Sequence, residues 1–192
     1  MTCSAGLLWD HHQIFHRYVE DCGIRCDVVT PHLLAAPFFR SRFVAMIVPT
    51  GFGNPSYSRL FPALGASAER IERYVEDGGN LLVYGAATAR TDAYAWLPFP
   101  VTYVHGISTE SVTTDPCSSA SAILEGCDCG CVTTDGFFTR YDATPRIWNS
   151  CGTPVLLEYR YGKGSIVVTS IHEYPSRKFL SGFCCSGRET LF

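Results

Sequence analysis

Two pairs of polar residues directly follow apolar runs in this chain, and both pairs could do chemistry. His172 and Glu173 end one run, and Asp10 and His11 end another. An imidazole titrates near neutral pH, so His172 could act as a general base that Glu173 orients. We take these two as candidate catalytic residues, and Asp10 and His11 as candidate ligand-binding residues.

Each of these residues also has a purely structural alternative. His172 could simply hydrogen-bond its own loop, and Glu173 could face solvent. An Asp that opens a helix, as we expect of Asp10, accepts hydrogen bonds from free amides and complements the helix dipole. His12 and His16 could chelate one metal ion but lack the intervening Glu of a zinc-protease motif, so the pattern favours the structural role.

A turn built of small residues lies in the middle of the chain. The stretch 78–88 indicates a helix end, a short buried strand and then Gly85, Ala86 and Ala87. In many α/β enzymes a turn after a central strand presents the nucleophile. Here the turn has that shape without a reactive side chain, and neither Thr50, Thr88 nor Ser170 sits in a G-x-S-x-G frame. We therefore expect Gly85 and Ala86 to contact a ligand rather than attack it.

A second loop follows the apolar run 43–49. It contains Thr50, Gly51, Gly53 and Asn54, and its glycines permit positive φ and close approach of the backbone to a ligand. We predict that these four residues bind a ligand too.

The elements that position these residues alternate between short apolar runs and amphipathic stretches. Strands are predicted at 5–9, 26–30, 43–49 and 81–84, helices at 14–22 and 57–77, and a hairpin at 154–161 and 165–171 with a three-residue turn. This alternation predicts a three-layer αβα sandwich with a flavodoxin-like, mostly parallel sheet and a C-terminal β-hairpin. Ligands in such sheets bind at the carboxyl ends of the strands, where the candidate residues should converge.

The chain length fits a single domain. We predict one domain over 1–180 of the 192 residues, with an irregular insert at about 91–150 and a tail at 181–192 that shows no periodicity.

Composition excludes several classes of protein. Hydrophobic residues make up 46% and charged residues 17%, which is typical of a globular protein and not of a disordered one. The formal net charge is −3, without a basic cluster that would indicate nucleic-acid binding. No apolar run approaches the roughly 20 residues of a membrane span. Residues 1–6 lack the features of a signal peptide, so we expect a cytoplasmic protein.

Ten cysteines are many for such a chain. We expect reduced thiols, several of them buried as small hydrophobic residues. Cys127, Cys129 and Cys131 alternate, and on a strand they would share one face. Zinc or iron on these three thiols is an alternative, although structural zinc sites use wider spacings. Otherwise we predict no cofactor.

The order of the elements resembles the class I glutamine amidotransferase-like superfamily, and among its members the divergent ThuA-like and biotin-protein-ligase N-terminal-like ones. Three stretches carry the resemblance. Residues 45–53 match a family strand that ends in Pro-Gly-Gly, and residues 74–82 match the segment that leads to the family's nucleophile. Residues 161–168, followed by His172, match the strand that delivers the family's catalytic histidine. Together these stretches span most of residues 5–178. The resemblance implies the same fold and a site at the strand ends.

The departures from the family are as informative as the matches. The family's cysteine falls on Gly85, and a glycine cannot form a glutaminyl thioester. The family's His-Pro-Glu ending is replaced by His172-Glu173-Tyr174-Pro175. The resemblance therefore implies a member of the superfamily that is not an amidotransferase.

Three functions follow as expectations. The first is a module, alone or as a homodimer, that binds a small polar or carbonyl-bearing molecule. The second is a hydrolase or lyase in which His172 is the general base and amides of the glycine loop steady an oxyanion. The third is a metal-binding or redox protein that uses the Cys127, Cys129 and Cys131 cluster. No nucleic-acid or membrane partner is expected.

Overall fold

The computed structural model describes residues 3–172 and 174–192. Its helices are α1 (Ile14–Asp21), α2 (Pro31–Ala35), α3 (Leu60–Ala66), α4 (Ala68–Glu76) and α5 (Arg177–Cys185), with a 3₁₀ helix η1 (Ser119–Leu124). Its strands are β1 (Ser4–Leu8), β2 (Arg25–Val29), β3 (Arg42–Phe43), β4 (Ala45–Val48), β5 (Asn80–Val83), β6 (Val101–Glu110), β7 (Val112–Thr114), β8 (Val132–Tyr141), β9 (Thr144–Asn149), β10 (Pro154–Tyr161), β11 (Gly164–Thr169) and β12 (Thr190–Leu191).

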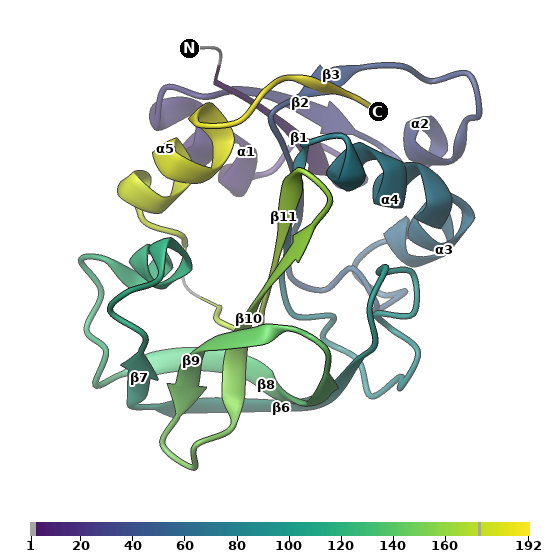
Figure 1. Ribbon diagram of the computed structural model, residues 1–192. Helices are drawn as coiled ribbons and strands as arrows, with labels where there is room; N and C mark the ends of the chain where they lie inside the picture. Colours follow the sequence, from purple (N-terminus) through teal and green to yellow (C-terminus); the bar gives the residue numbers. More distant parts are fainter. Residues whose placement is uncertain (1–2, 173) are drawn as a thin grey trace.

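An eight-stranded sheet forms the centre of the molecule (Figure 1). Its strand order is β2-β1-β4-β5-β11-β10-β9-β7. The first five strands are parallel neighbours, and the last three continue the sheet in antiparallel pairs. The mostly parallel sheet and its C-terminal hairpin confirm the predicted fold class.

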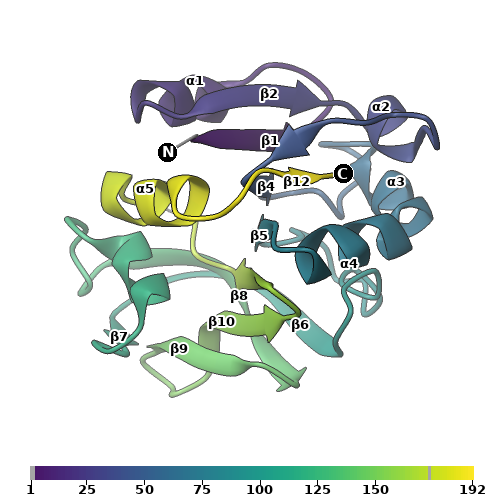
Figure 2. The same ribbon diagram turned by 45° about the horizontal axis from the view of Figure 1, so that its top comes forward.

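Strands β1, β4, β5 and β11 are almost entirely buried, as continuous apolar runs predict, whereas the edge strand β2 exposes Arg25 and Asp27. Every residue of β1 and β4 is buried. Met46 and Val48 pack into one hydrophobic core, and Ala45 and Ile47 pack into another. Helices α1 and α5 cover one face of this half, and α2, α3 and α4 cover the other (Figure 2). The result is a three-layer sandwich.

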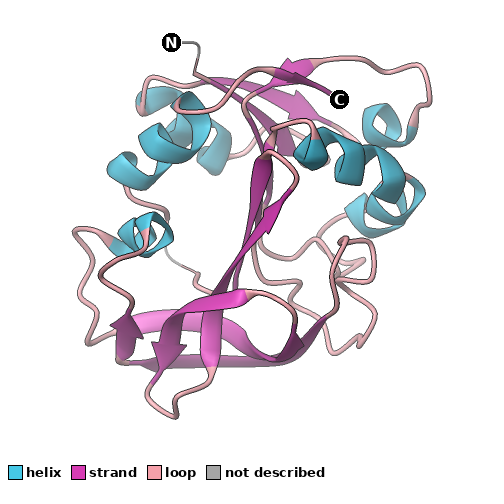
Figure 3. Cartoon of the chain, in the orientation of Figure 1, coloured by secondary structure: helices cyan, strands magenta, loops and turns pink. Residues whose placement is uncertain are grey.

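The insert predicted at 91–150 is more regular than its sequence indicates. β6 and β8 are ten residues each and pair with one another in a separate two-stranded sheet, while β7 and β9 extend the main sheet. Figure 3 shows these strands gathered at the end of the molecule away from most helices. The sequence predicts loops and short strands here but not strands of this length, because half of the β6 residues are exposed and form no apolar stripe.

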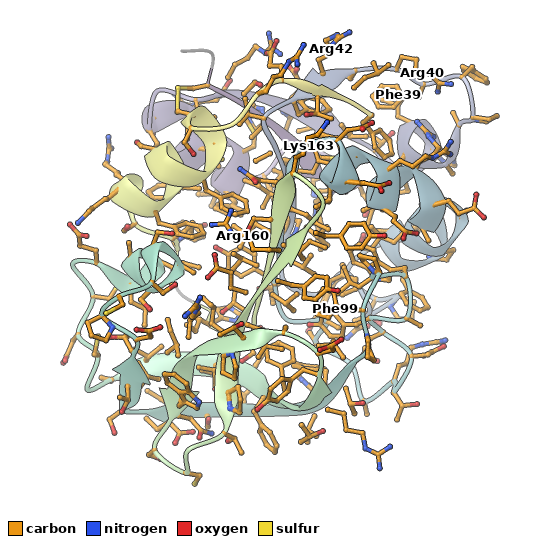
Figure 4. All side chains as sticks on the ribbon, viewed as in Figure 1. Phe39, Arg40, Arg42, Phe99, Arg160 and Lys163 are labelled. Atoms are coloured by element: carbon orange, nitrogen blue, oxygen red, sulfur yellow. A yellow bond between two sulfur atoms is a disulfide. The ribbon has the colours of Figure 1, made fainter. Side chains whose placement is uncertain are left out.

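The hairpin of β10 and β11 has a tighter turn than predicted. Tyr161 lies opposite Gly164, which leaves the two-residue loop Gly162–Lys163 instead of three residues. Gly162 adopts a φ of 57°, a conformation that two-residue hairpin turns require and glycine allows. Lys163 lies at the tip (Figure 4), and its amide donates to the Glu76 carbonyl at 2.9 Å. The turn is thereby fixed to the end of α4.

The C-terminal residues form regular structure. Ser176 Oγ accepts a hydrogen bond from the Phe179 amide at 3.0 Å and so caps α5, whose buried face then packs on the sheet. The predicted domain boundary at residue 180 falls inside this helix, and β12 pairs with β3. Cys185 forms a disulfide with Cys3, so our prediction of reduced thiols is wrong for this pair.

Within the part of the chain that the structure describes, no helix combines the length and apolarity needed to cross a membrane.

Candidate functional site

The glycine loop and the small-residue turn meet at the carboxyl ends of the strands, as predicted. The amide of Gly51 donates to the carbonyl of Gly85 at 2.8 Å, and the amide of Gly53 donates to that of Ala86 at 3.1 Å. The side-chain amide of Asn54 donates to the Ala87 carbonyl at 3.3 Å. These donors bind the turn itself, so the Gly51 and Gly53 amides do not form the oxyanion hole that the hydrolase hypothesis needs.

A carboxylate lies beside Gly85, where a side chain at that position would stand. Asp135, which is only 2% exposed, lies against Gly85. A Cβ atom on Gly85 would stand 2.8 Å from Asp135 Oδ2 and 2.9 Å from its Cβ, closer than real Cβ contacts. Glycine is therefore required at position 85 because the Asp135 side chain fills the space beside it.

Asp135 also contacts the histidine that the sequence singles out. Its Oδ1 lies 3.0 Å from Nδ1 of His172, whose side chain is 56% exposed. No hydrogen-bond partner of Asp135 Oδ2 exists among the described residues. The carboxylate holds one imidazole nitrogen, and this orients the other nitrogen for contact with a ligand or a water molecule.

Strand pairing fixes Asp135 in this position. Its amide donates to the Ser170 carbonyl at 2.7 Å, and its carbonyl accepts from the Tyr103 hydroxyl at 2.6 Å. The His172 amide donates to the Thr133 carbonyl at 2.8 Å. β8 thus runs beside the end of β11. Asp135 was not among the predicted site residues, because the dipeptide Asp135-Gly136 is more typical of a turn than of a buried site.

A small cavity of about 130 Å³ opens beside His172. It is lined by Gln13, Phe15, Pro49, Thr50, Tyr84, His172 and Tyr174. Gln13 Nε2 and the Tyr84 hydroxyl are buried polar atoms without a hydrogen-bond partner among the described residues. Burial raises the pKa of Tyr84 well above its ordinary value, so its hydroxyl remains a neutral donor. The side chains that carry these two buried donors therefore belong to the wall of the same small cavity as His172.

Aromatic rings form one wall of the small cavity. Tyr174 stacks on Phe15 at 5.3 Å and on Tyr18 at 5.1 Å between ring centroids, and Tyr18 donates to the Pro175 carbonyl at 2.8 Å. The segment after His172 is thus packed on α1. Glu173, our second candidate catalytic residue, lies outside the described residues.

The remaining candidates lie away from the small cavity. Asp10 accepts hydrogen bonds from the Ser58 hydroxyl and, at 3.2 Å, from the Arg59 amide, so it holds the loop before α3 and does not open α1. The first helix begins only at Ile14. Asp10 and Gly53 line a separate, large cavity, whereas His11 is exposed and lines neither cavity. Of the predicted residues that the structure describes, Thr50 and His172 alone line the small cavity.

The two metal hypotheses find no support in the geometry. His16 Nε2 lies 2.9 Å from the Cys26 carbonyl, which uses one nitrogen of the proposed His12–His16 pair. Cys127, Cys129 and Cys131 are exposed in a turn after η1, so our assumption that they share a strand face is wrong. Among residues 3–172 and 174–192, no three His, Cys, Asp or Glu side chains are grouped to hold an ion.

No family model matches the sequence, and no curated protein matches it. Solved structures do resemble it in fold. A polyextremophilic β-galactosidase from the haloarchaeon Halorubrum lacusprofundi matches 96% of this chain at 13% identity and a TM-score of 0.58. A cold-adapted β-galactosidase from Rahnella sp. R3 matches 95% at 13% identity and 0.56. The chain spans about 30% of the length of these two enzymes.

A cytoplasmic protein from Salmonella typhimurium matches along its whole length. The match covers 93% of this chain and 95% of that one, at 15% identity and a TM-score of 0.55. At these identities the comparisons show the fold alone: this chain has an α/β sandwich architecture that occurs both as a separate protein and as part of larger enzymes.

Proposed function

We propose that this chain binds a small carbonyl- or carboxylate-bearing molecule in the small cavity, and that it is a member of the glutamine amidotransferase-like superfamily without amidotransferase activity. The observation that carries the proposal is the pair of buried donors, Gln13 Nε2 and the Tyr84 hydroxyl, which lack partners beside His172. A buried polar group without a partner costs about 1–3 kcal/mol, so such groups mark a place where a ligand atom can bind.

The chemistry of the cavity defines the ligand class. Amide and phenol donors, together with an imidazole, match the oxygen atoms of a carbonyl or carboxylate group. A volume of about 130 Å³ holds a group of a few heavy atoms, since one water takes up about 30 Å³ in the liquid. The position of Asp135 against Gly85 supports the loss of amidotransferase chemistry, because it leaves no room for a side chain at position 85.

Two buried tyrosines provide the test. Tyr84→Phe removes a hydroxyl without a described partner, so we expect it to stabilise the free protein by about 1 kcal/mol while weakening ligand binding. Tyr94 is the matched control: its hydroxyl donates to the Tyr84 carbonyl and accepts from the Ala86 amide, so Tyr94→Phe should destabilise by about 1–3 kcal/mol.

Stability is measured by urea unfolding, and binding by NMR titration with acetate and with acetamide. Saturable shifts at the amides of Thr50 and Tyr84 that Tyr84→Phe weakens would support the proposal. If Tyr84→Phe destabilises the free protein as much as Tyr94→Phe does, the hydroxyl has a structural partner and the proposal fails.

A second candidate function is general-base catalysis of hydrolysis or proton abstraction. The specific observation in its favour is the hydrogen bond between the buried Asp135 carboxylate and His172, which is the arrangement that orients a basic imidazole. Against it stands the use of the Gly51 and Gly53 amides within the fold.

His172→Ala separates the two functions. A catalyst should lose turnover of an ester such as p-nitrophenyl acetate, whereas a binding module should keep its fold and lose only part of its affinity for acetate. Residual ester hydrolysis that is equal in the wild type and in His172→Ala would exclude the catalytic alternative.

The likeness to β-galactosidases concerns the fold alone, at 13% identity over about 30% of those enzymes. Glycoside hydrolysis generally needs two carboxyl groups that flank the bond. Of the described residues at or beside the small cavity, Asp135 alone carries one.

A further inference from the structure

The large cavity, which Gly53 of the glycine loop helps to line, has a volume of about 840 Å³, which lies in the range of ligand sites. Its walls come from α2, the loop before α3, α3 itself and Arg90. Most of the lining is apolar: Pro31, Ala35, Pro55, Phe61, Pro62, Ala63 and Ala66. An apolar hollow of this size accepts the hydrocarbon or ring portion of a molecule.

Most polar groups in this lining already have partners inside the protein. Asp10 binds the Ser58 hydroxyl and the Arg59 amide, and Thr30 Oγ1 accepts from the Leu33 amide at 3.4 Å. Arg90 pairs with Asp92 through Nε at 3.0 Å and Nη2 at 2.8 Å. Its guanidinium lies 4.7 Å from the centre of the Phe61 ring. The Asp10 and Thr30 side-chain oxygens therefore already accept hydrogen bonds from other groups of the protein.

The polar side chains that remain are both donors. The Arg59 guanidinium has no hydrogen bond or ion pair with any described residue, and the His32 imidazole has none either. Arg59 borders the cavity next to the apolar surface of α3. A guanidinium without a partner beside an apolar wall matches a molecule with an apolar body and an acidic group.

We propose that the large cavity binds a small acidic amphiphile, with the apolar body against α2 and α3 and the acidic group on Arg59. This site is separate from the small cavity, so the two proposals stand or fall independently. The occupant is a free small molecule and not a protein, because a single unpaired guanidinium borders an apolar cavity whose volume of about 840 Å³ is that of a small-molecule site.

The probe is 4-phenylbutyrate, compared with the neutral 4-phenylbutanamide by calorimetry and by amide NMR shifts. We expect the acid to bind saturably, with shifts at Ala35 and Ala66, and the amide to bind about tenfold more weakly. Arg59→Gln should reduce the affinity for the acid to that for the amide and leave the affinity for the amide unchanged. Ala66→Trp, at an exposed position on the cavity wall, should abolish binding of both.

Arg17→Gln is the matched control. It also removes one positive charge from an exposed position, but Arg17 lies on α1 and does not line this cavity. The proposal is overturned if acid and amide bind equally, if Arg17→Gln acts like Arg59→Gln, or if neither probe binds saturably. It is also overturned if sedimentation shows a dimer that Ala66→Trp dissociates, since the hollow would then be an interface between two copies.

Discussion

The two halves of the molecule differ in how much of their strand surface is buried. In the parallel half, formed by β1, β2, β4, β5 and β11 with helices on both faces, all strands except the edge strand β2 are mostly apolar and buried. In the antiparallel half, formed by β6 to β10, β6 and the end of β8 are largely exposed, and β8 buries the polar Thr134 and Asp135. The parallel half supplies the frame of the small cavity, and the antiparallel half supplies the charge beside it.

The cysteines show the same division. Cys26 on β2 and Cys184 on α5 are buried, whereas Cys117, Cys129, Cys131 and Cys151 are exposed. The Cys26 and Cys184 side chains belong to the hydrophobic core, and these four exposed thiols are accessible to reagents in solution. This division gives the comparison its most sensitive test.

Thiol labelling should show the largest effect. Burial raises the pKa of Cys26 and of Cys184 to about 12, so at pH 8 each holds about a thousandfold less thiolate than an ordinary thiol. We expect iodoacetamide, mapped by mass spectrometry, to label Cys151 rapidly and these two only as the protein unfolds. Raising the pH to 10 keeps both mostly protonated. Equal labelling of Cys26 and Cys151 in native protein would remove the distinction.

A glycine pair tests how closely the antiparallel strands are packed. Gly136 on β8 has a φ of 153°, and a Cβ there would lie 2.1 Å from the Val104 carbonyl oxygen. We expect Gly136→Ala to destabilise the protein by about 3 kcal/mol or more in urea unfolding. Gly106→Ala, on the facing strand with nothing within 4 Å, should change stability by less than about 1 kcal/mol. Similar losses from both would contradict the close contact of β6 with β8 at Gly136.

The contact between the halves at the site is tested by restoring a thiol. Gly85→Cys should cost about 1–3 kcal/mol, because its Cβ meets the Asp135 carboxylate. Asp135→Ala in the same chain should recover most of that loss, which a double-mutant cycle measures. If the two changes in unfolding free energy were additive, Asp135 would not occupy the space beside position 85.

The smallest effect is expected where α5 meets η1 at the surface. Lys178 Nζ lies 2.6 Å from Glu125 Oε2, but both side chains are half exposed or more. Lys178→Ala should change stability by about 0.5 kcal/mol or less, since solvent screens such pairs. A loss above about 1 kcal/mol would mean that this ion pair helps to dock the two halves.

Sequence patterning predicts the parallel half well, because strands buried on both faces are continuous apolar runs. The runs at 5–9, 26–30 and 81–84 correspond to β1, β2 and β5 within a residue or two. Our sequence analysis missed α5, although Phe179, Leu180, Phe183 and Cys184 have helical spacing and Ser176 is a good cap. It also missed α2, although Thr30 caps that helix and Pro31 opens it.

The sequence predicts one part of the site, the meeting of the glycine loop with Gly85, but not the pairing of Asp135 with His172. Strand ends of a parallel sheet share one edge, so the meeting of the glycine loop with Gly85 follows from local patterns. Asp135 reaches His172 across 37 residues through pairing between separate strands, and no local pattern encodes such pairing. Local patterns also cannot predict that the Tyr84 hydroxyl and Gln13 Nε2 lack hydrogen-bond partners among the described residues, because that depends on the positions of all their neighbours in the fold.

The disulfide between Cys3 and Cys185 makes the chain almost a closed ring. It joins residues 182 positions apart, and in the chain-entropy model a loop of that length disfavours the unfolded state by about 5 kcal/mol. One proteolytic cut in any surface loop inside the ring would leave a single covalent molecule. On a non-reducing gel such nicked protein should migrate as one band, and a reducing agent should release two fragments.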